Sequence, residues 1–98
     1  MFDLTRLRGL SASDGIQEFE ADAHYAEFGQ AHNVAVNVEL ERVYVIGSTQ
    51  GNLDGVCAGG WHVIDVTDPL NPVGMGCAGQ DGYVHDTECI VYDGPDTR

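Results

Sequence analysis

The sequence predicts an all-β chain. Glycine is frequent, with 13 residues among 98, and 3 prolines add further turn signals. No long stretch repeats apolar residues at helical spacing. Residues 61–66 are instead apolar, aromatic or β-branched apart from His62 and Asp65, which is typical of a strand inside a sheet. Turn residues separate several short runs of this kind, and this arrangement favours an antiparallel sheet.

Three strands are expected in the first half of the chain. Residues 18–25 alternate between apolar and charged or polar side chains, which predicts a half-exposed strand whose acidic face discourages pairing with another chain. Residues 31–39 form the next expected strand, with its valines on one face. Residues 42–48 are largely apolar on both faces and are therefore expected to be buried.

The second half begins with a Gly-rich loop at 49–60, followed by the strand at 61–66. Residues 67–72 end that strand, because two prolines fix φ and remove hydrogen-bond donors. The side chains of Asp68 and Asn71 can bond to the nearby backbone and stabilise the turn.

Two more strands complete the prediction. Residues 72–78 are the expected outer partner of the strand before them, with Val73, Met75 and Cys77 on one face. A last strand is expected over residues 85–92.

A short pattern occurs twice in the sequence. His32 precedes Asn33 and His85 precedes Asp86, each at the start of an expected strand, with an offset of 53 residues. Four expected strands fit between the two starts. Four antiparallel strands per roughly 40–50 residues is the unit of a β-propeller blade.

The chain is therefore predicted to be a fragment of a β-propeller. Residues 31–79 would form one complete four-stranded antiparallel blade. Residues 1–30 would be the end of the preceding blade with a connecting loop, and residues 80–98 would supply the first strand of the next blade. Chance similarity between the two pattern occurrences is the alternative, because two occurrences make a weak repeat.

The charge balance is strongly acidic. Asp and Glu number 16 against 4 basic residues, which gives a net charge of -12. This charge argues against nucleic acid and anionic membrane surfaces as partners. A solvated acidic surface and cation binding are both compatible with it. The sequence shows neither a signal-peptide pattern nor an apolar run long enough to span a membrane, so the signal of an exported protein would lie elsewhere.

Several segments resemble the choice-of-anchor B family, whose β-propellers carry the LVIVD repeat. The segment Val63-Ile64-Asp65-Val66-Thr67-Asp68-Pro69, ending in Asn71-Pro72-Val73, resembles the repeat itself. Further matching segments are, in order, Asp3-Leu4-Thr5, Ala31-His32-Asn33, Cys57 with Gly59-Gly60, Gly76-Cys77, Asp81-Gly82-Tyr83, His85-Asp86, and Cys89-Ile90-Val91-Tyr92 with Gly94-Pro95-Asp96-Thr97. Together these segments cover most of the chain.

The resemblance implies an internal fragment of a longer exported protein that carries a C-terminal anchor. It places the protein outside the cell or at the cell surface, with the remaining blades of the same parent chain as partners. It carries over no catalytic residues. The implied function is a non-catalytic scaffold for a protein or glycan ligand, in which the blades ring a channel and the loops present the contact surface.

The resemblance also implies a pairing for the 3 cysteines. The family pattern has a further Cys shortly after the Gly-Pro-Asp turn, which would pair with Cys89 from beyond the end of this chain. Cys57 would then pair with Cys77, 20 positions away. A bridge of that length contributes about 3 kcal/mol in the chain-entropy description. Three free, buried thiols are the alternative.

His32 and His85 are the candidate metal ligands, with Asp86 beside the second. In a propeller the first strand of each blade lines the central channel, so the two histidines would converge on the axis, and His is a common metal ligand. The alternative function is therefore a metal-dependent enzyme with a His-lined centre that holds a divalent ion, either Ca²⁺ or a transition metal. Hydrogen bonding to the neighbouring blade is the structural interpretation, and the spacing matches no zinc signature.

Other polar residues receive structural interpretations. His62 is expected to be a hydrogen-bonded sheet histidine and His24 to be exposed. Asp65 is expected to bond to backbone or a turn, because a buried carboxylate needs donors. Asp81 and the turn at 93–96 offer carboxylates for Ca²⁺, as in an acidic adhesion module. They fall short of an EF-hand pattern, so plain turns are the default.

Overall fold

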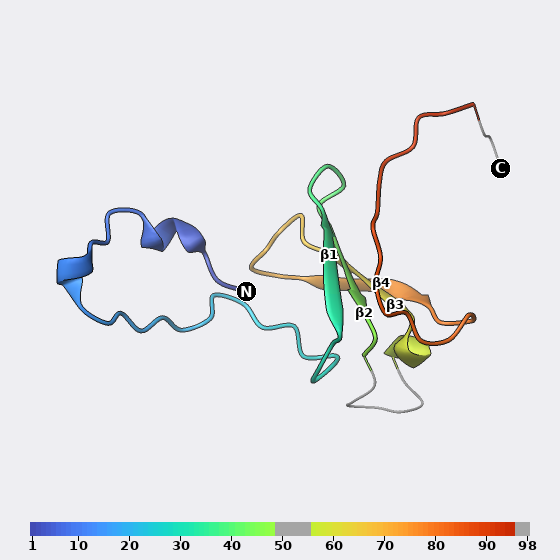
Figure 1. The fold of residues 1–98 in the computed structure, drawn as a ribbon, viewed down its shortest axis with the longest axis horizontal. Coiled ribbons are helices and arrows are strands. Elements are labelled where there is room, and N and C mark those ends of the chain that lie inside the picture. The colour runs from blue at the N-terminus through green and yellow to red at the C-terminus, as the bar shows by residue number, and fades with distance from the viewer. Residues whose placement is uncertain (49–55, 96–98) are drawn as a thin grey trace.

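The computed structural model describes residues 1–48 and 56–95. Within them, four strands form one antiparallel sheet in sequence order (Figure 1). The strands are β1 (Asn33–Asn37), β2 (Arg42–Ile46), β3 (Trp61–Asp65) and β4 (Val73–Ala78). The helical elements are short 3₁₀ turns, η1 (Leu4–Leu7), η2 (Ala12–Asp14) and η3 (Val56–Gly59). The fold is all-β, and in the described part of the chain no helix has the length and apolar character to cross a membrane.

The four strands lie where the sequence predicts them, at 31–39, 42–48, 61–66 and 72–78. Side chains that bond to the backbone end two of them. Asn37 Oδ1 accepts the Leu40 N–H at 3.0 Å after β1, and Asp65 Oδ1 accepts the Thr67 N–H at 2.8 Å after β3. The expected role of Asp65 as a turn residue is confirmed, and Arg42 pairs with the same carboxylate at 3.0 Å.

The turn between β3 and β4 is stabilised by Asp68. Its Oδ1 accepts the Leu70 N–H at 3.0 Å, and its Oδ2 accepts the Asn71 side-chain amide at 2.7 Å. The Asn71 side-chain amide and the Leu70 N–H hold the pKa of Asp68 below its ordinary value. The expected turn-stabilising role of Asp68 and Asn71 is therefore confirmed.

A β-bulge interrupts the ladder between β3 and β4. Val63 pairs with Gly76 and Ile64 pairs with Gly74, so Met75 has no partner in the ladder. An extra residue reverses the alternation of side chains beyond it. Val73 and Cys77 consequently lie on opposite faces of the sheet, and the prediction that they share a face is wrong.

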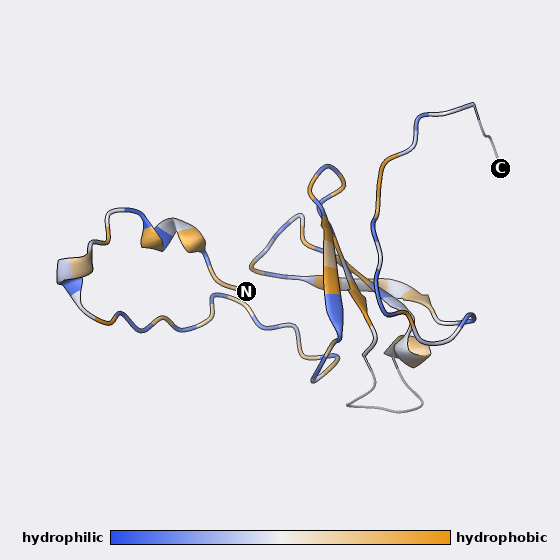
Figure 2. Ribbon diagram, in the orientation of Figure 1, coloured by the Kyte–Doolittle hydropathy of each residue, from blue (hydrophilic) through white to orange (hydrophobic). Residues whose placement is uncertain are grey.

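One face of the sheet carries the buried histidine, and we call it the histidine face. Cross-strand neighbours share a face, and the register assigns to it Val34, Val36, Val43, Val45, His62, Ile64 and Cys77. Val45, His62 and Ile64 are buried in its centre. Hydrophobic residues run along β1 and β2 (Figure 2).

The histidine face is only partly covered. Residues 24–28 of the N-terminal segment lie against its centre, where Tyr25 and Phe28 contact the His62 ring. Val34 and Val36 remain 50% and 59% exposed. An open hollow of ≈ 260 Å³ lies between this segment and the sheet.

A loop of the N-terminal segment and the C-terminal segment up to residue 95 extend away from the sheet, while Met1 lies close to it (Figure 1). The radius of gyration is 16.4 Å, against about 13 Å for a compact domain of this length. Residues 18–25 and 85–92 do not form the strands predicted for them. A strand requires backbone hydrogen bonds to a neighbour, and among the described residues neither segment makes them with a strand of the sheet.

Candidate functional site

The structure brings the two occurrences of the His-Asn/Asp pattern into contact. The ring centroids of His32 and His85 lie 4.1 Å apart, with the planes at 50°. One residue further along, the Asn33 side-chain amide donates to Asp86 Oδ1 at 3.0 Å across a separation of 53 residues. Equivalent positions of the pattern therefore meet in register. We call these four residues the paired-histidine site.

Backbone contacts hold the two sides of this site together. His32 N–H donates to the Ile46 carbonyl at 3.0 Å, next to the start of β1. Val84 N–H donates to the Gly59 carbonyl at 2.9 Å, which anchors the C-terminal segment. Gly47 has a φ of +65, and a Cβ there would come within 2.6 Å of His32 Cβ. Only glycine fits this close approach without displacing the histidine.

The paired-histidine site offers two imidazoles at the surface. Both rings are exposed to solvent, and Asp86 Oδ1 accepts from the Thr87 N–H at 2.9 Å as well as from Asn33. In residues 1–48 and 56–95, three potential ligand atoms come within 4.8 Å of one another in a different place, at Cys57, His62 and Cys77. Of the predicted ligand set, His32 and His85 lie in ring-to-ring contact, whereas the Asp86 carboxylate bonds to Asn33 and to the Thr87 N–H.

A second cluster is centred on His62, and we call it the His62 cluster. The His62 side chain is buried, with the residue 3% exposed, and its Nε2 lies 2.7 Å from Tyr25 Oη. Its Nδ1 lies 3.4 Å from Cys57 Sγ. The Glu27 carboxylate is 3.8 Å from Nε2. The expectation of a hydrogen-bonded sheet histidine is confirmed.

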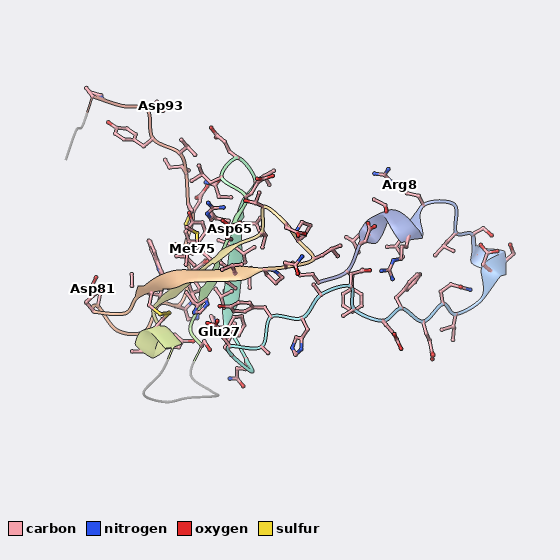
Figure 3. The ribbon with its side chains drawn as sticks, turned by 180° about the vertical axis from the view of Figure 1, so that it is seen from behind. Arg8, Glu27, Asp65, Met75, Asp81 and Asp93 are labelled. Atoms are coloured by element: carbon pink, nitrogen blue, oxygen red, sulfur yellow. A yellow bond between two sulfur atoms is a disulfide. The ribbon has the colours of Figure 1, made fainter. Side chains whose placement is uncertain are left out.

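Burial controls the charge of this cluster. Desolvation lowers the pKa of His62, and the nearby Glu27 carboxylate opposes that change. Desolvation and the interaction with Glu27 raise the pKa of Tyr25, which therefore keeps its proton. Figure 3 places Glu27 where the N-terminal segment meets the sheet. Gly74 allows the Tyr25 side chain to approach the sheet, because a Cβ at position 74 would meet Tyr25 Oη.

The sulfur side of the cluster is a disulfide between Cys57 and Cys77. This is the pairing that the family resemblance implies, and it is confirmed. Cys77 lies directly opposite His62 in the ladder between β3 and β4. Cys89 is the free cysteine of the chain.

An unusual backbone turn brings Cys57 to this position. Cys57, Ala58 and Gly59 have φ values of 66, 45 and 79. For residues other than glycine this left-handed conformation costs roughly 1–3 kcal/mol each. The turn also lies against the end of β4, since a Cβ at Gly79 would meet the Cys57 carbonyl oxygen and one at Gly60 would meet the Ala78 carbonyl oxygen.

The carboxylates considered for Ca²⁺ are not brought together. Asp81 lies at the turn after β4, and Asp93 lies near the far end of the C-terminal segment (Figure 3). Asp96 lies outside the described residues. His24 is exposed, as predicted.

No protein-family model, no curated protein and no solved structure matches this chain. The resemblance to the choice-of-anchor B family stays a prediction.

Proposed function

We propose that this chain supplies about one blade, with parts of both neighbours, of an exported or cell-surface β-propeller of the LVIVD-repeat kind. In this proposal the propeller is a non-catalytic scaffold that binds a protein or glycan through its loops. Residues 31–79 form the blade, and further blades of the parent chain complete the ring.

The register of the paired-histidine site carries the proposal. His32 contacts His85, and Asn33 contacts Asp86, at the same offset in sequence. Neighbouring blades of a propeller place equivalent residues of their first strands side by side around the axis. Contacts between equivalent positions are therefore what two successive blades would make.

The sheet itself supports the same proposal. Four antiparallel strands in sequence order are the topology of a propeller blade. A blade also needs its apolar face covered by a neighbour, since one repeat cannot bury that face alone. Val34 and Val36 on the histidine face and Val38 at the end of β1 are between 50% and 82% exposed. They provide the apolar surface on which a neighbouring blade would rest.

A metal-dependent enzyme is the second candidate function. The observation that favours it is the tilted ring contact between His32 and His85, which presents two imidazoles at one point. A divalent ion there would act as a Lewis acid or redox centre once other blades supplied further ligands.

Metal content and ligand binding distinguish the two functions. The purified chain is analysed by plasma mass spectrometry beside a His32→Ala, His85→Ala variant, and both are tested on a glycan array with and without a chelator. The scaffold predicts no stoichiometric metal and binding that survives chelation. About one ion per chain, lost in the double variant, would favour the enzyme and overturn the scaffold.

A further inference from the structure

We propose that reduction of the Cys57–Cys77 disulfide converts the His62 cluster into a binding site for a thiophilic divalent cation, best matched by Zn²⁺. The ligands are Cys57 Sγ, Cys77 Sγ and His62 Nδ1. This inference is separate from the paired-histidine site and does not depend on the scaffold function.

The distances among the three ligand atoms fit this proposal. All three lie within 4.8 Å of one another. Cys57 Sγ is 3.4 Å from His62 Nδ1. Zinc–sulfur and zinc–nitrogen bonds in a tetrahedral site place S and N about 3.6 Å apart and two sulfurs about 3.8 Å apart. The sulfur–nitrogen separation therefore already suits zinc, and the two sulfurs only need to separate once their bond is cleaved.

The backbone supplies the ligands from fixed positions. His62 lies on β3, Cys77 lies opposite it on β4, and Cys57 lies on η3 immediately before β3. The left-handed backbone at Cys57 and Ala58 directs the Cys57 sulfur toward Nδ1 of His62. Strained backbone of this kind concentrates at functional sites, where the surrounding structure holds a side chain in place.

The surroundings of His62 match those of a metal-binding histidine. Such a histidine donates its second ring N–H to an oxygen, which fixes the ring and leaves the other nitrogen unprotonated. Tyr25 Oη lies 2.7 Å from Nε2 and can accept that hydrogen bond. The Glu27 carboxylate lies behind it, 3.8 Å from the same nitrogen. Nδ1, which faces the sulfur, is then free to bind the ion.

The Cys77 side of the site is exposed to solvent. His62 and Cys57 are buried, whereas Cys77 is exposed on β4. A reductant and an ion can therefore approach through Cys77. The imidazole is buried, and the lower dielectric there strengthens its interaction with a cation.

The chemical steps balance with a dithiol as the reductant. One thiolate of the dithiol attacks Cys77 Sγ, and Cys57 leaves as a thiolate. The second thiol of the reductant displaces Cys77 and closes the oxidised cyclic disulfide, so two electrons and two protons have passed to the protein. Zn²⁺ then binds both sulfurs and releases the two thiol protons to solvent.

Cobalt(II) is the probe for this site, because it enters zinc sites and absorbs visible light. The full chain is reduced anaerobically with a water-soluble phosphine, which becomes the phosphine oxide with oxygen from water. The reduced wild type is expected to bind about one Co²⁺ per chain, with thiolate charge-transfer bands and tetrahedral d–d bands, and Zn²⁺ should displace it. The oxidised wild type should show neither band.

Matched variants locate the ligands. His62→Gln should lower the affinity at least tenfold and Tyr25→Phe about tenfold or more, as expected for a ligand and its hydrogen-bond partner. His24→Gln removes an exposed histidine and Cys89→Ser the free thiol, and both should bind as the wild type does. Equal binding by wild type and His62→Gln would overturn the proposal, as would loss of binding in Cys89→Ser.

Reduction could also unfold the chain, and circular dichroism settles this case. If reduction removes the sheet signal, Zn²⁺ should restore it in the wild type and not in His62→Gln, because the ion then stabilises the folded site. Failure of Zn²⁺ to restore the sheet, or failure of the reduced chain to bind any ion stoichiometrically, would overturn the proposal.

Discussion

The ring of His85 contacts that of His32 at a tilt of 50°, with the centroids 4.1 Å apart, and the next residue on each side adds a hydrogen bond between Asn33 and Asp86. The start of β1 and the C-terminal segment are thus attached at two successive positions in one register. Because each attachment joins two side chains, its strength can be measured by substitution.

We expect Asn33 and Asp86 to be energetically coupled. Asn33→Ala and Asp86→Ala should each cost about 0.5–1.5 kcal/mol, because each leaves one partner of the hydrogen bond without the other. The double variant should cost about 0.5–1 kcal/mol less than the sum of the two, measured by urea unfolding of all four proteins. Asp81→Ala removes an exposed carboxylate from the same segment and is the control. If the two losses in the free energy of unfolding were strictly additive, Asn33 and Asp86 would not be energetically coupled.

Removal of the disulfide should be costly in metal-free buffer. Replacing Cys57 and Cys77 together by serine is expected to lower the free energy of unfolding by about 3 kcal/mol, since the bridge closes a loop of 20 positions. Chemical denaturation with a chelator present measures the change. Cys89→Ser, which removes the free thiol, should have little effect. If Cys89→Ser lost as much free energy of unfolding as the double variant, the assignment of the disulfide to Cys57 and Cys77 would be contradicted.

The turn at η3 should tolerate no side chain at its contact with β4. A Cβ at Gly79 would meet the Cys57 carbonyl oxygen, so Gly79→Ala is expected to destabilise the fold by roughly 1–3 kcal/mol. Gly29→Ala is the control, because the space around Gly29 is open. Thermal unfolding of the two variants gives the comparison, and equal melting temperatures would show that the turn does not pack against β4 as described.

Stability should fall as the pH drops below the ordinary pKa of histidine. Burial lowers the pKa of His62 from 6.5, so the unfolded state takes up a proton that the folded state resists. The contribution of His62 is complete above 6.5 and is lost as the pH falls through 6.5 toward the lowered folded value. Urea unfolding of the oxidised, metal-free chain from about pH 8 to about pH 5 measures the slope.

A variant separates this effect from the carboxylates. His62→Gln should be less stable overall but should lose the slope below 6.5. Hydrogen bonds from Thr67 to Asp65 and from Asn71 to Asp68 lower the pKa of those carboxyls from 3.8, so their contributions are lost only below 3.8. A slope near pH 6 that persists in His62→Gln would assign the pH dependence to another group.

The chain should associate with itself at increasing concentration. Among residues 1–48 and 56–95, β1 and β4 are the edge strands of the sheet and pair on one side only, and Val36 on β1 is 59% exposed on the histidine face. Exposed edges and apolar sheet faces are sites of intermolecular pairing. Sedimentation equilibrium should show a rising average mass, and Val36→Lys should reduce it. A monomer with two-state unfolding at all concentrations would contradict this expectation.

Local patterns predicted most of the sheet. The four strands and the turn at Asp68 follow from β-branched runs and from prolines, which act within a few residues. The strands expected at 18–25 and 85–92 did not form, although residues 18–25 alternate regularly between apolar and polar side chains. Alternation shows that a segment can be a strand, but only a neighbouring edge supplies the hydrogen bonds.

The His62 cluster could be predicted only in parts. His62 and the disulfide were each expected, but their contact was not, because a regular hairpin through the turn at Asp68 would place Gly76 opposite His62. The extra residue at Met75 moves Cys77 into that position. Tyr25 and Glu27 come from a segment 37 and 35 positions earlier in the chain, and no local pattern links them to β3.

Because of the bulge at Met75, the chemistry of the histidine face depends on how β4 pairs with β3 and not only on which residues β4 contains. If β4 kept all its residues but paired with β3 without the bulge, Gly76 would lie opposite His62, and Cys77 would lie on the opposite side of the sheet, away from Cys57. The one-residue shift that the bulge introduces thus determines whether Cys77 can reach Cys57. Inserting one residue between Gly74 and Cys77 should therefore be far more damaging than exchanging one side chain for another, whereas deleting Met75 should keep Cys77 opposite His62 in a regular ladder.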